Sequence, residues 1–389
     1  MSEIGEPEPP VGVEGTPTPW PGGGYMYRPG EVLAAPEAVA VVQEHVARLK
    51  GSRADVESLS HSDLVRVRVD VEVPELIRAM RNVEHDVQPP AVSPNHVLHE
   101  FSHIRFFSRL PPVPAQPLPP LTPDERGVGV TVAVIDSGAW DHDWYRGSVQ
   151  IAANNGEEPD ENGNELLDLC RGHGTFVSGL VLQHAPGANV VARRFPGHAM
   201  GPAEGRVVVD DVELAAMLDD LGDDVDVVNM SLGGWTEGDT APPATAAALA
   251  RLQARNRTCV VVAAAGNEPT TRPTWPAAFK GVIAVGALDP FGEPWEFSAT
   301  GWWVDAWADG VDAQSTFFVW PGGMEREDGS SDPFDGWATW TGTSFAAPRV
   351  SGTIAAMADG HGGARRAARK LFNAADPLAG QFGVVPTLS

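Results

Sequence analysis

Cysteine and basic residues are scarce in this chain, and each shortage excludes a class of protein. Only two cysteines occur in 389 residues, so no disulfide framework is expected to support the fold. There are 27 lysines and arginines against 52 aspartates and glutamates, which gives a net charge of −25. This strong negative charge argues against nucleic acid and anionic membranes as partners.

Long apolar runs are missing as well, and none is long enough to span a membrane. The first 30 residues contain neither a basic segment nor an apolar core, so they do not resemble an ordinary signal peptide. We therefore expect a cytoplasmic location, with secretion by another route as the alternative.

Glycine and proline are abundant, with 42 and 35 residues, and 42% of the chain is hydrophobic. This composition is typical of a globular protein with many irregular connections. The proline- and glycine-rich residues 1–27 predict a disordered leader. Residues 28–105 alternate strand and helix patterns, of which the strand 64–71 is the clearest because its valines alternate with charged residues. We predict a small α+β module here.

A linker, residues 106–123, separates this module from the rest of the chain. It contains seven prolines between 111 and 123, which predicts an extended, stiff and exposed segment. Residues 124–389 alternate apolar runs with helical patterns, which is typical of a parallel sheet flanked by helices. The segment 317–337, rich in glycine and aspartate, predicts a surface loop. Buried strands are predicted at 130–135, 225–230, 258–265 and 282–287.

Three residues suited to nucleophilic catalysis occur at the ends of predicted elements. Asp136 ends a buried strand, where open α/β sheets place their sites, although an Asx turn would also explain it. His173 begins an apolar helix between two glycines, whereas a lone histidine is more often structural. Ser344 begins another helix, where its hydroxyl and backbone N–H face the same space, but it could equally be a helix cap.

Taken together, these residue types form a candidate catalytic triad. The histidine takes the proton of the serine, and the aspartate orients the imidazole and stabilises its cation. Asn267 follows a strand and a glycine, so its amide is a candidate donor to the developing oxyanion.

The motifs resemble those of the subtilases, the subtilisin-like serine proteases. Asp136-Ser137-Gly138, Gly172-His173-Gly174-Thr175 and Gly342-Thr343-Ser344 occur in the subtilisin order Asp, His, Ser. Ser231-Leu232-Gly233-Gly234 is similar to the substrate-binding segment of the family. Ala264-Ala265-Gly266-Asn267 is similar to the second binding segment with its oxyanion asparagine.

The resemblance covers about residues 129–357 and implies a three-layer, subtilisin-like α/β domain with a mainly parallel sheet. It implies a serine endopeptidase in which Ser344 attacks a peptide carbonyl and forms an acyl-enzyme. The backbones of 231–234 and 264–266 would pair with an extended polypeptide substrate. This chemistry requires no cofactor and no metal. A catalytically silent subtilase fold that only binds partners is the alternative, and the complete set of motifs disfavours it.

The module at 28–105 is similar to the propeptides that fold beside many subtilases and inhibit them. The resemblance implies that this module binds its own catalytic domain, and that the chain is a zymogen. Activation would occur by self-cleavage within 100–123 or through a partner. A permanently attached accessory domain is the alternative.

An acidic loop offers oxygen ligands at alternating positions, and subtilases commonly bind calcium. Its glycine is misplaced for an EF-hand, so a solvated acidic loop is favoured over a structural calcium site. The residues concerned are Asp160, Glu161, Asn162, Asn164 and Asp168.

Overall fold

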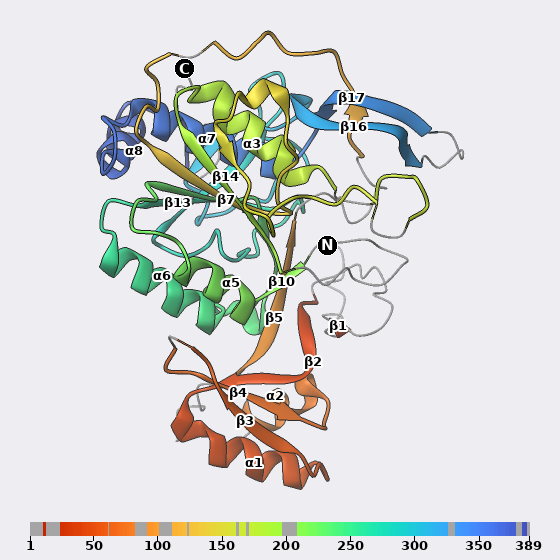
Figure 1. Ribbon diagram of the computed structural model, residues 1–389. Helices are drawn as coiled ribbons and strands as arrows, with labels where there is room; N and C mark the ends of the chain where they lie inside the picture. The colour runs from red at the N-terminus through yellow and green to blue at the C-terminus, as the bar shows by residue number, and fades with distance from the viewer. Residues whose placement is uncertain are drawn as a thin grey trace, which may run out of the picture.

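The computed structural model places a small N-terminal module below a larger domain (Figure 1). Among the described residues, no helix has the length and apolar character needed to cross a membrane. Most of the predicted leader lies outside these residues. The structure describes residues 11–12, 24–60, 62–81, 92–100, 111–122, 124–160, 163–168, 171–196, 208–325, 331–378 and 383–386.

The N-terminal module is an antiparallel sheet in the order β5-β2-β4-β3 with two helices. The predicted alternation in β4 is observed, since Val65, Val67 and Val69 are buried in one core with side chains of both helices. The short edge strand β3 was not predicted. The elements are β1 (Val11–Gly12), β2 (Met26–Ala34), η1 (Pro36–Ala38), α1 (Val39–Arg48), β3 (Ala54–Ser58), β4 (Val65–Val69), α2 (Val73–Arg81) and β5 (Val92–Glu100).

Strand β5 continues from the module into the larger domain. It pairs antiparallel with β10 (Val208–Asp210), where Leu98 is opposite Val209. It also pairs antiparallel with β12 (Leu232–Gly233), where Glu100 is opposite Leu232. The last strand of the module therefore lies between two strands of the larger domain, and the two bodies share one sheet.

The larger domain is built around a sheet of nine described strands in the order β18-β19-β15-β14-β13-β11-β7-β9-β8. All neighbours pair in parallel except β18 and β19. The central strands are apolar at successive positions because both faces are covered. The strands are β7 (Thr131–Asp136), β8 (Val149–Gln150), β9 (Asn189–Arg194), β11 (Val227–Met230), β13 (Val260–Ala264), β14 (Val282–Leu288), β15 (Ala306–Asp309), β18 (Asp376–Pro377) and β19 (Val384–Val385).

Helices cover both faces of this sheet (Figure 1). Side chains of α3 and α7 share one core with one face, and those of α5 and α6 share a second core with the other. The small residues Ala346 and Ala347 are fully buried and let α7 pack closely. The predicted three-layer α/β fold is confirmed. The helices are η2 (Asp143–Tyr145), α3 (His173–His184), α5 (Asp211–Asp219), η3 (Glu237–Asp239), α6 (Pro243–Arg255), α7 (Thr343–Met357) and α8 (Ala364–Asn373).

The surface loop predicted at 317–337 is instead most of a hairpin, β16 (Ala313–Glu325) and β17 (Ser331–Trp340). The prediction was wrong because buried aromatic side chains, among them Phe317 and Phe318, anchor the hairpin in the core. The third strand of this sheet is β6 (Val113–Pro114) from the proline-rich linker.

The described part of the linker, residues 111–122, contains no helix, and part of it is bound to the larger domain. Besides the pairing of β6 with β17, Trp144 Nε1 donates to the carbonyl of Pro119 at 2.8 Å. Arg146 Nη1 donates to the carbonyl of Leu121 at 3.3 Å. Residues 111–122 therefore cross the top of the domain on several anchor points (Figure 1).

Candidate active site

Asp136 is the last residue of β7, and its side chain is fully buried. Its Oδ1 accepts a hydrogen bond from the backbone N–H of Ser137 at 2.8 Å. His173 Nδ1 lies 2.8 Å from the same oxygen. A carboxylate can only accept, so this contact favours the imidazole tautomer with the proton on Nδ1.

His173 is the first residue of α3, and the glycines on either side allow its close approach to β7. A Cβ on Gly174 would lie 2.0 Å from the carbonyl oxygen of Gly138. Gly172 has a φ of +84°, and a Cβ there would lie 2.2 Å from the ring of Phe317. Any other residue at these positions would push the imidazole away from Asp136.

Aromatic rings restrict the position of the imidazole. The ring of Trp340 meets His173 edge-on with a centroid distance of 5.5 Å, and Phe345 lies 5.3 Å away. All three side chains are buried. Phe345 directly follows Ser344, so this contact also places the start of α7 beside His173.

Ser344 lies in the first turn of α7, where backbone N–H groups have no partner within the helix. Its hydroxyl donates to the carbonyl of Ser231 at 3.2 Å, and the hydroxyl of Ser231 donates to the carbonyl of Ser344 at 2.8 Å. This reciprocal pair joins the serine to the segment that leads into β12.

Asn267 is held beside Ser344 through Thr343, a residue that the sequence argument did not single out. The Asn267 Oδ1 accepts from the backbone N–H of Thr343 at 2.9 Å and from its hydroxyl at 2.8 Å. Because the amide oxygen is occupied, the orientation of the amide NH₂ is fixed as well. The threonine of the Gly-Thr-Ser motif was the available signal for this role.

The two predicted substrate-binding segments differ in their contacts. In the first, Ser231 to Gly234, residues 232 and 233 pair with β5. In the second, Ala264 to Gly266, the N–H of Gly266 donates to Thr343 Oγ1 at 3.0 Å, and its carbonyl accepts from Ala299 at 2.8 Å. The second segment therefore supports Thr343 and Asn267, and its pairing with substrate stays a prediction.

A buried carboxylate, Glu157, lies behind Asp136 and was not predicted from the sequence. Glu157 is 3% exposed, and its carboxylate oxygens accept hydrogen bonds from both Ser137 and Thr175. Burial raises its pKa, and the charge of Asp136 raises it further, against the opposing effect of these hydrogen bonds. It was missed because Glu157 begins an acidic stretch that is typical of a solvated loop.

The predicted acidic loop is held together by one of its own side chains. The carboxylate of Asp160 accepts from the backbone N–H groups of Gly163, Asn164 and Glu165 at 2.8 to 3.0 Å. The predicted ligands Glu161 and Asn162 lie outside the described residues. Within the residues that are described, no group of three or more histidine, cysteine or acidic side chains is placed to hold a metal ion.

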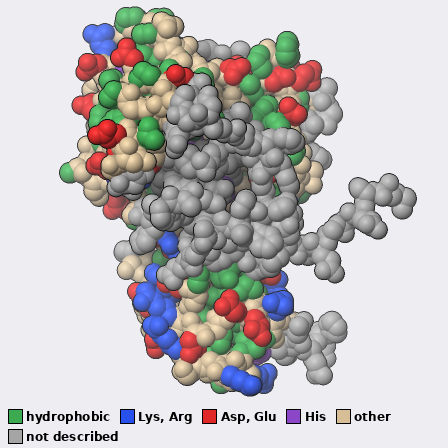
Figure 2. All heavy atoms as spheres, turned by 90° about the vertical axis from the view of Figure 1, so that its right-hand side faces the viewer, with side chains coloured by type: hydrophobic (Ala, Val, Ile, Leu, Met, Phe, Trp, Pro, Cys, Tyr) green, Lys and Arg blue, Asp and Glu red, His purple; other side chains and the backbone are tan. Residues whose placement is uncertain are grey.

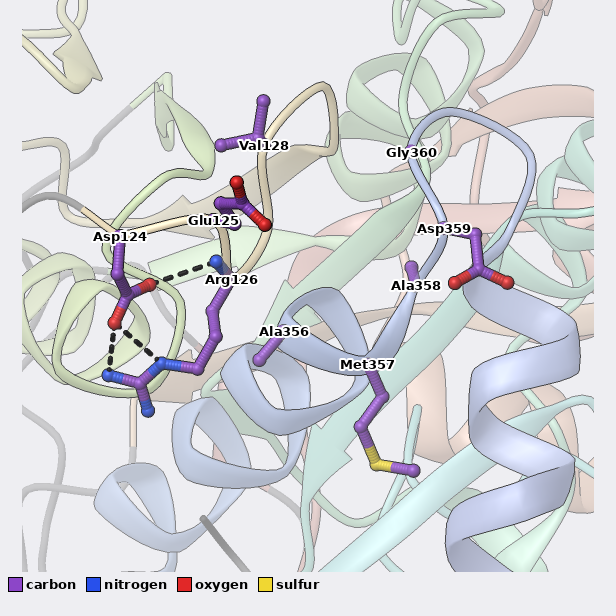
Figure 3. Close-up of a pocket in the computed structure, with 9 residues that line it drawn as sticks. All are labelled: Asp124, Glu125, Arg126, Val128, Ala356, Met357, Ala358, Asp359 and Gly360. Carbon is purple, nitrogen blue, oxygen red and sulfur yellow. Dashed lines mark hydrogen bonds and ion pairs between the residues drawn. The ribbon is translucent and has the colours of Figure 1, made fainter.

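A cavity of about 660 Å³ lies between residues 124–128 and the end of α7 (Figure 3). Asp124 and Arg126 form an ion pair on its wall, and Met357 lies on the other side. Ser344 and Met357 are 13 residues apart in α7, or about 20 Å. The cavity is therefore at the opposite end of the helix from the candidate site.

Comparisons with known proteins show the family and the fold. Residues 127–375 match the model of the subtilase family. Subtilisin E of Bacillus subtilis (strain 168) is 29% identical over 301 residues, which cover 73% of this chain and 69% of that protein. Subtilisin BL of Lederbergia lenta is 32% identical over 241 residues, which cover 59% and 76%.

Two solved structures share the fold. Fervidolysin from Fervidobacterium pennivorans, a keratinolytic enzyme, has a TM-score of 0.58 at 20% identity over 93% of this chain. The chain spans only 60% of the fervidolysin chain. The protease domain of PatA, solved as a serine-to-alanine mutant, has a TM-score of 0.52 at 23% identity and covers 68% of this chain and 94% of its own. The chain belongs to the subtilase family and is a subtilisin-like serine peptidase.

Proposed function

We propose that this peptidase is a serine endopeptidase that acts through Asp136, His173 and Ser344. The observation that carries the proposal is the 2.8 Å contact between His173 Nδ1 and Asp136 Oδ1, with Ser344 in the helix turn next to His173. This contact leaves Nε2 as the imidazole nitrogen that receives a proton. In the resting geometry the Ser344 hydroxyl donates to Ser231, so it must rotate toward the imidazole before attack.

The catalytic cycle then follows from these positions. Ser344 Oγ attacks the peptide carbonyl while His173 takes its proton, and the imidazolium gives that proton to the leaving amine. Water hydrolyses the acyl-enzyme with the same histidine as base. The backbone N–H of Ser344 and the amide of Asn267 are the proposed oxyanion donors. Asp136 orients the imidazole and stabilises its charge.

We further propose that the N-terminal module is an intramolecular inhibitor. Support comes from the register of β5, in which Glu100 lies opposite Leu232 and His99 opposite Gly233. Ser231, the residue before Leu232, contacts the Ser344 hydroxyl. We infer from this register that the end of β5 binds as an extended peptide substrate would, and the peptide bonds just after Glu100 are the proposed cleavage sites.

Ion pairs support the binding of the module to the larger domain. Arg28 Nε lies 2.9 Å from Asp210 and Arg28 Nη2 3.2 Å from Glu213, and Arg81 pairs with Glu237. Figure 2 shows basic and acidic side chains together on the module, and mainly acidic ones on the visible face of the larger domain. The complementary charges at these ion pairs favour association of the two bodies.

Fluorophosphonate labelling with intact-mass measurement tests the proposal, using the full-length chain and Ser344→Ala side by side. We expect labelling at Ser344 and a mass loss that corresponds to cleavage just after residue 100, both absent in the variant. Labelling without cleavage would contradict self-processing and leave the module as a stable regulator. Absence of labelling even after proteolytic removal of the module would contradict the peptidase mechanism itself.

A further inference from the structure

Glu157 is a buried carboxylate to which the proposed mechanism assigns no role. It lies in the segment after β8, and its backbone N–H donates to the carbonyl of Ala139 at 3.1 Å. In return, the N–H of Ala139 donates to the carbonyl of Asn155 at 3.0 Å. This pairing holds Glu157 beside the turn that follows Asp136.

Four groups donate hydrogen bonds to the Glu157 carboxylate. The backbone N–H of Gly172 lies 3.0 Å from Oε1, and that of Thr175 lies 3.2 Å from Oε2. The hydroxyls of Ser137 and Thr175 donate to the same two oxygens. A backbone N–H cannot accept a proton, so these contacts favour the ionised carboxylate. A negative charge here also caps the start of α3, the helix that His173 begins.

Ser137 connects Glu157 to the Asp136–His173 pair. Its Oγ lies 3.2 Å from Asp136 Oδ1, the oxygen that contacts His173. The same Oγ accepts from the backbone N–H of Gly174 at 2.9 Å. A hydroxyl has a single proton, so Ser137 donates either to Glu157 or to Asp136. An ionised Glu157 draws this proton away and leaves Asp136 Oδ1 available to His173.

We propose that Glu157 is a positioning residue for the catalytic triad. It determines the hydrogen bonding of Asp136 through Ser137, and it holds the helix turn that carries His173 through Gly172 and Thr175. Its negative charge also favours the imidazolium that forms when His173 takes a proton. The inference rests on the proposed serine peptidase mechanism and adds a further residue to it.

Glu157→Gln removes the charge with little change in volume. The new amide can donate to Ser137, which redirects the Ser137 proton to Asp136 in competition with His173. We expect kcat to fall about 10- to 100-fold with KM nearly unchanged, by analogy with the loss of an outer group that orients a metal ligand. The loss of a negative charge should also move the acid limb of the kcat/KM profile to lower pH by about one unit.

Two further variants separate positioning from simple structural support. Glu157→Asp keeps the charge and should restore the acid limb to its wild-type position, although its shorter side chain lowers kcat. Asp226→Asn is the matched control, because Asp226 is fully buried and accepts from the N–H groups of Thr131 and Gly362 at 3.0 and 2.6 Å. It precedes β11, at the end of the sheet opposite to Asp136. This control should lower stability and leave the pH profile unchanged.

The experiment compares pH profiles on active-site-titrated protein, with circular dichroism as the check on folding. A folded Glu157→Gln with the wild-type profile and kcat would overturn the inference. If that variant does not fold, Glu157→Asp decides, because it keeps the charge and shortens only the side chain that reaches Ser137, Gly172 and Thr175. A several-fold drop in its kcat supports the inference, and an unchanged kcat overturns it. Lack of fluorophosphonate labelling in the wild-type protein, even after proteolytic removal of the module, would instead refute the proposed function.

Discussion

His96 makes the contact between the N-terminal module and the larger domain sensitive to pH. It lies in β5 with no exposed surface, and its Nε2 accepts from the backbone N–H of Glu237 at 2.9 Å. Burial lowers its pKa from 6.5 to about 3, and the charge of Arg81 contributes to this shift. A protonated ring could not accept the Glu237 hydrogen bond, so the closed interface requires neutral His96.

The size of this pH effect follows from the pKa values of His96 in the closed and the opened interface. In the opened interface His96 regains its ordinary pKa, so it is protonated below about pH 6.5. In the closed interface it stays neutral down to about pH 3. Its contribution to interface stability is therefore complete above pH 6.5 and declines as the pH falls. Between pH 7 and pH 5 the loss is about 2 kcal/mol, or about 30-fold in the opening equilibrium.

Hydrogen exchange of the β5 amides measures this effect in the uncleaved Ser344→Ala chain, with rates corrected for intrinsic pH dependence. The comparison is with the same chain carrying His96→Asn, which can accept the Glu237 bond but does not titrate. We expect wild-type protection at residues 97–99 to fall about 30-fold more than that of the variant from pH 7 to pH 5. Burial raises the pKa values of Glu237 and Glu213 in the closed interface, so their protonation at low pH favours that state and opposes the effect of His96. The comparison cancels this contribution because both chains carry these two residues. An equal fall in both chains would refute the reasoning.

Three other outcomes are expected. Asn267→Ala should lower kcat about 10²- to 10³-fold in steady-state kinetics, a range taken from the oxyanion asparagine of subtilisin, and an unchanged kcat would remove Asn267 from the site. Gly174→Ala places a Cβ 2.0 Å from the Gly138 carbonyl oxygen, so fluorophosphonate labelling should be largely lost in a chain that still folds by circular dichroism. Cys259 is 5% exposed with its pKa raised by burial to about 12, so iodoacetamide at about pH 8 should modify it only after unfolding, and rapid modification of the native chain would contradict this burial.

Much of the fold could be predicted because its strands carry strong local signals. The central strands β7, β11, β13 and β14 are buried on both faces, which requires apolar residues at successive positions. Strand β3 was missed because it is mostly exposed and carries polar residues, so its conformation depends on pairing with β4. The hairpin β16–β17 was missed because glycine and aspartate obscured the aromatic residues that anchor it.

The candidate site was predictable to a similar extent. Asp136, His173 and Ser344 each occur at the end of an element in a short motif, and the structure brings Asp136 and His173 into contact. Thr343 and Glu157 support this site through hydrogen bonds whose partners come from distant segments. The Gly-Thr-Ser motif was a signal for Thr343, whereas nothing in the residues next to Glu157 in sequence indicates its partners.

The sequence by itself determined the apolar strands, the helices between them and the chemical groups placed at their ends. These features depend on residue type and on spacing over a few positions. Only the tertiary structure decided that Glu157 is buried behind Asp136, and that β5 of the module lies between β10 and β12. Burial and strand pairing join segments that are distant along the chain. The free-energy cost of burying a polar group, and the gain from pairing it, arise only once these segments are packed together.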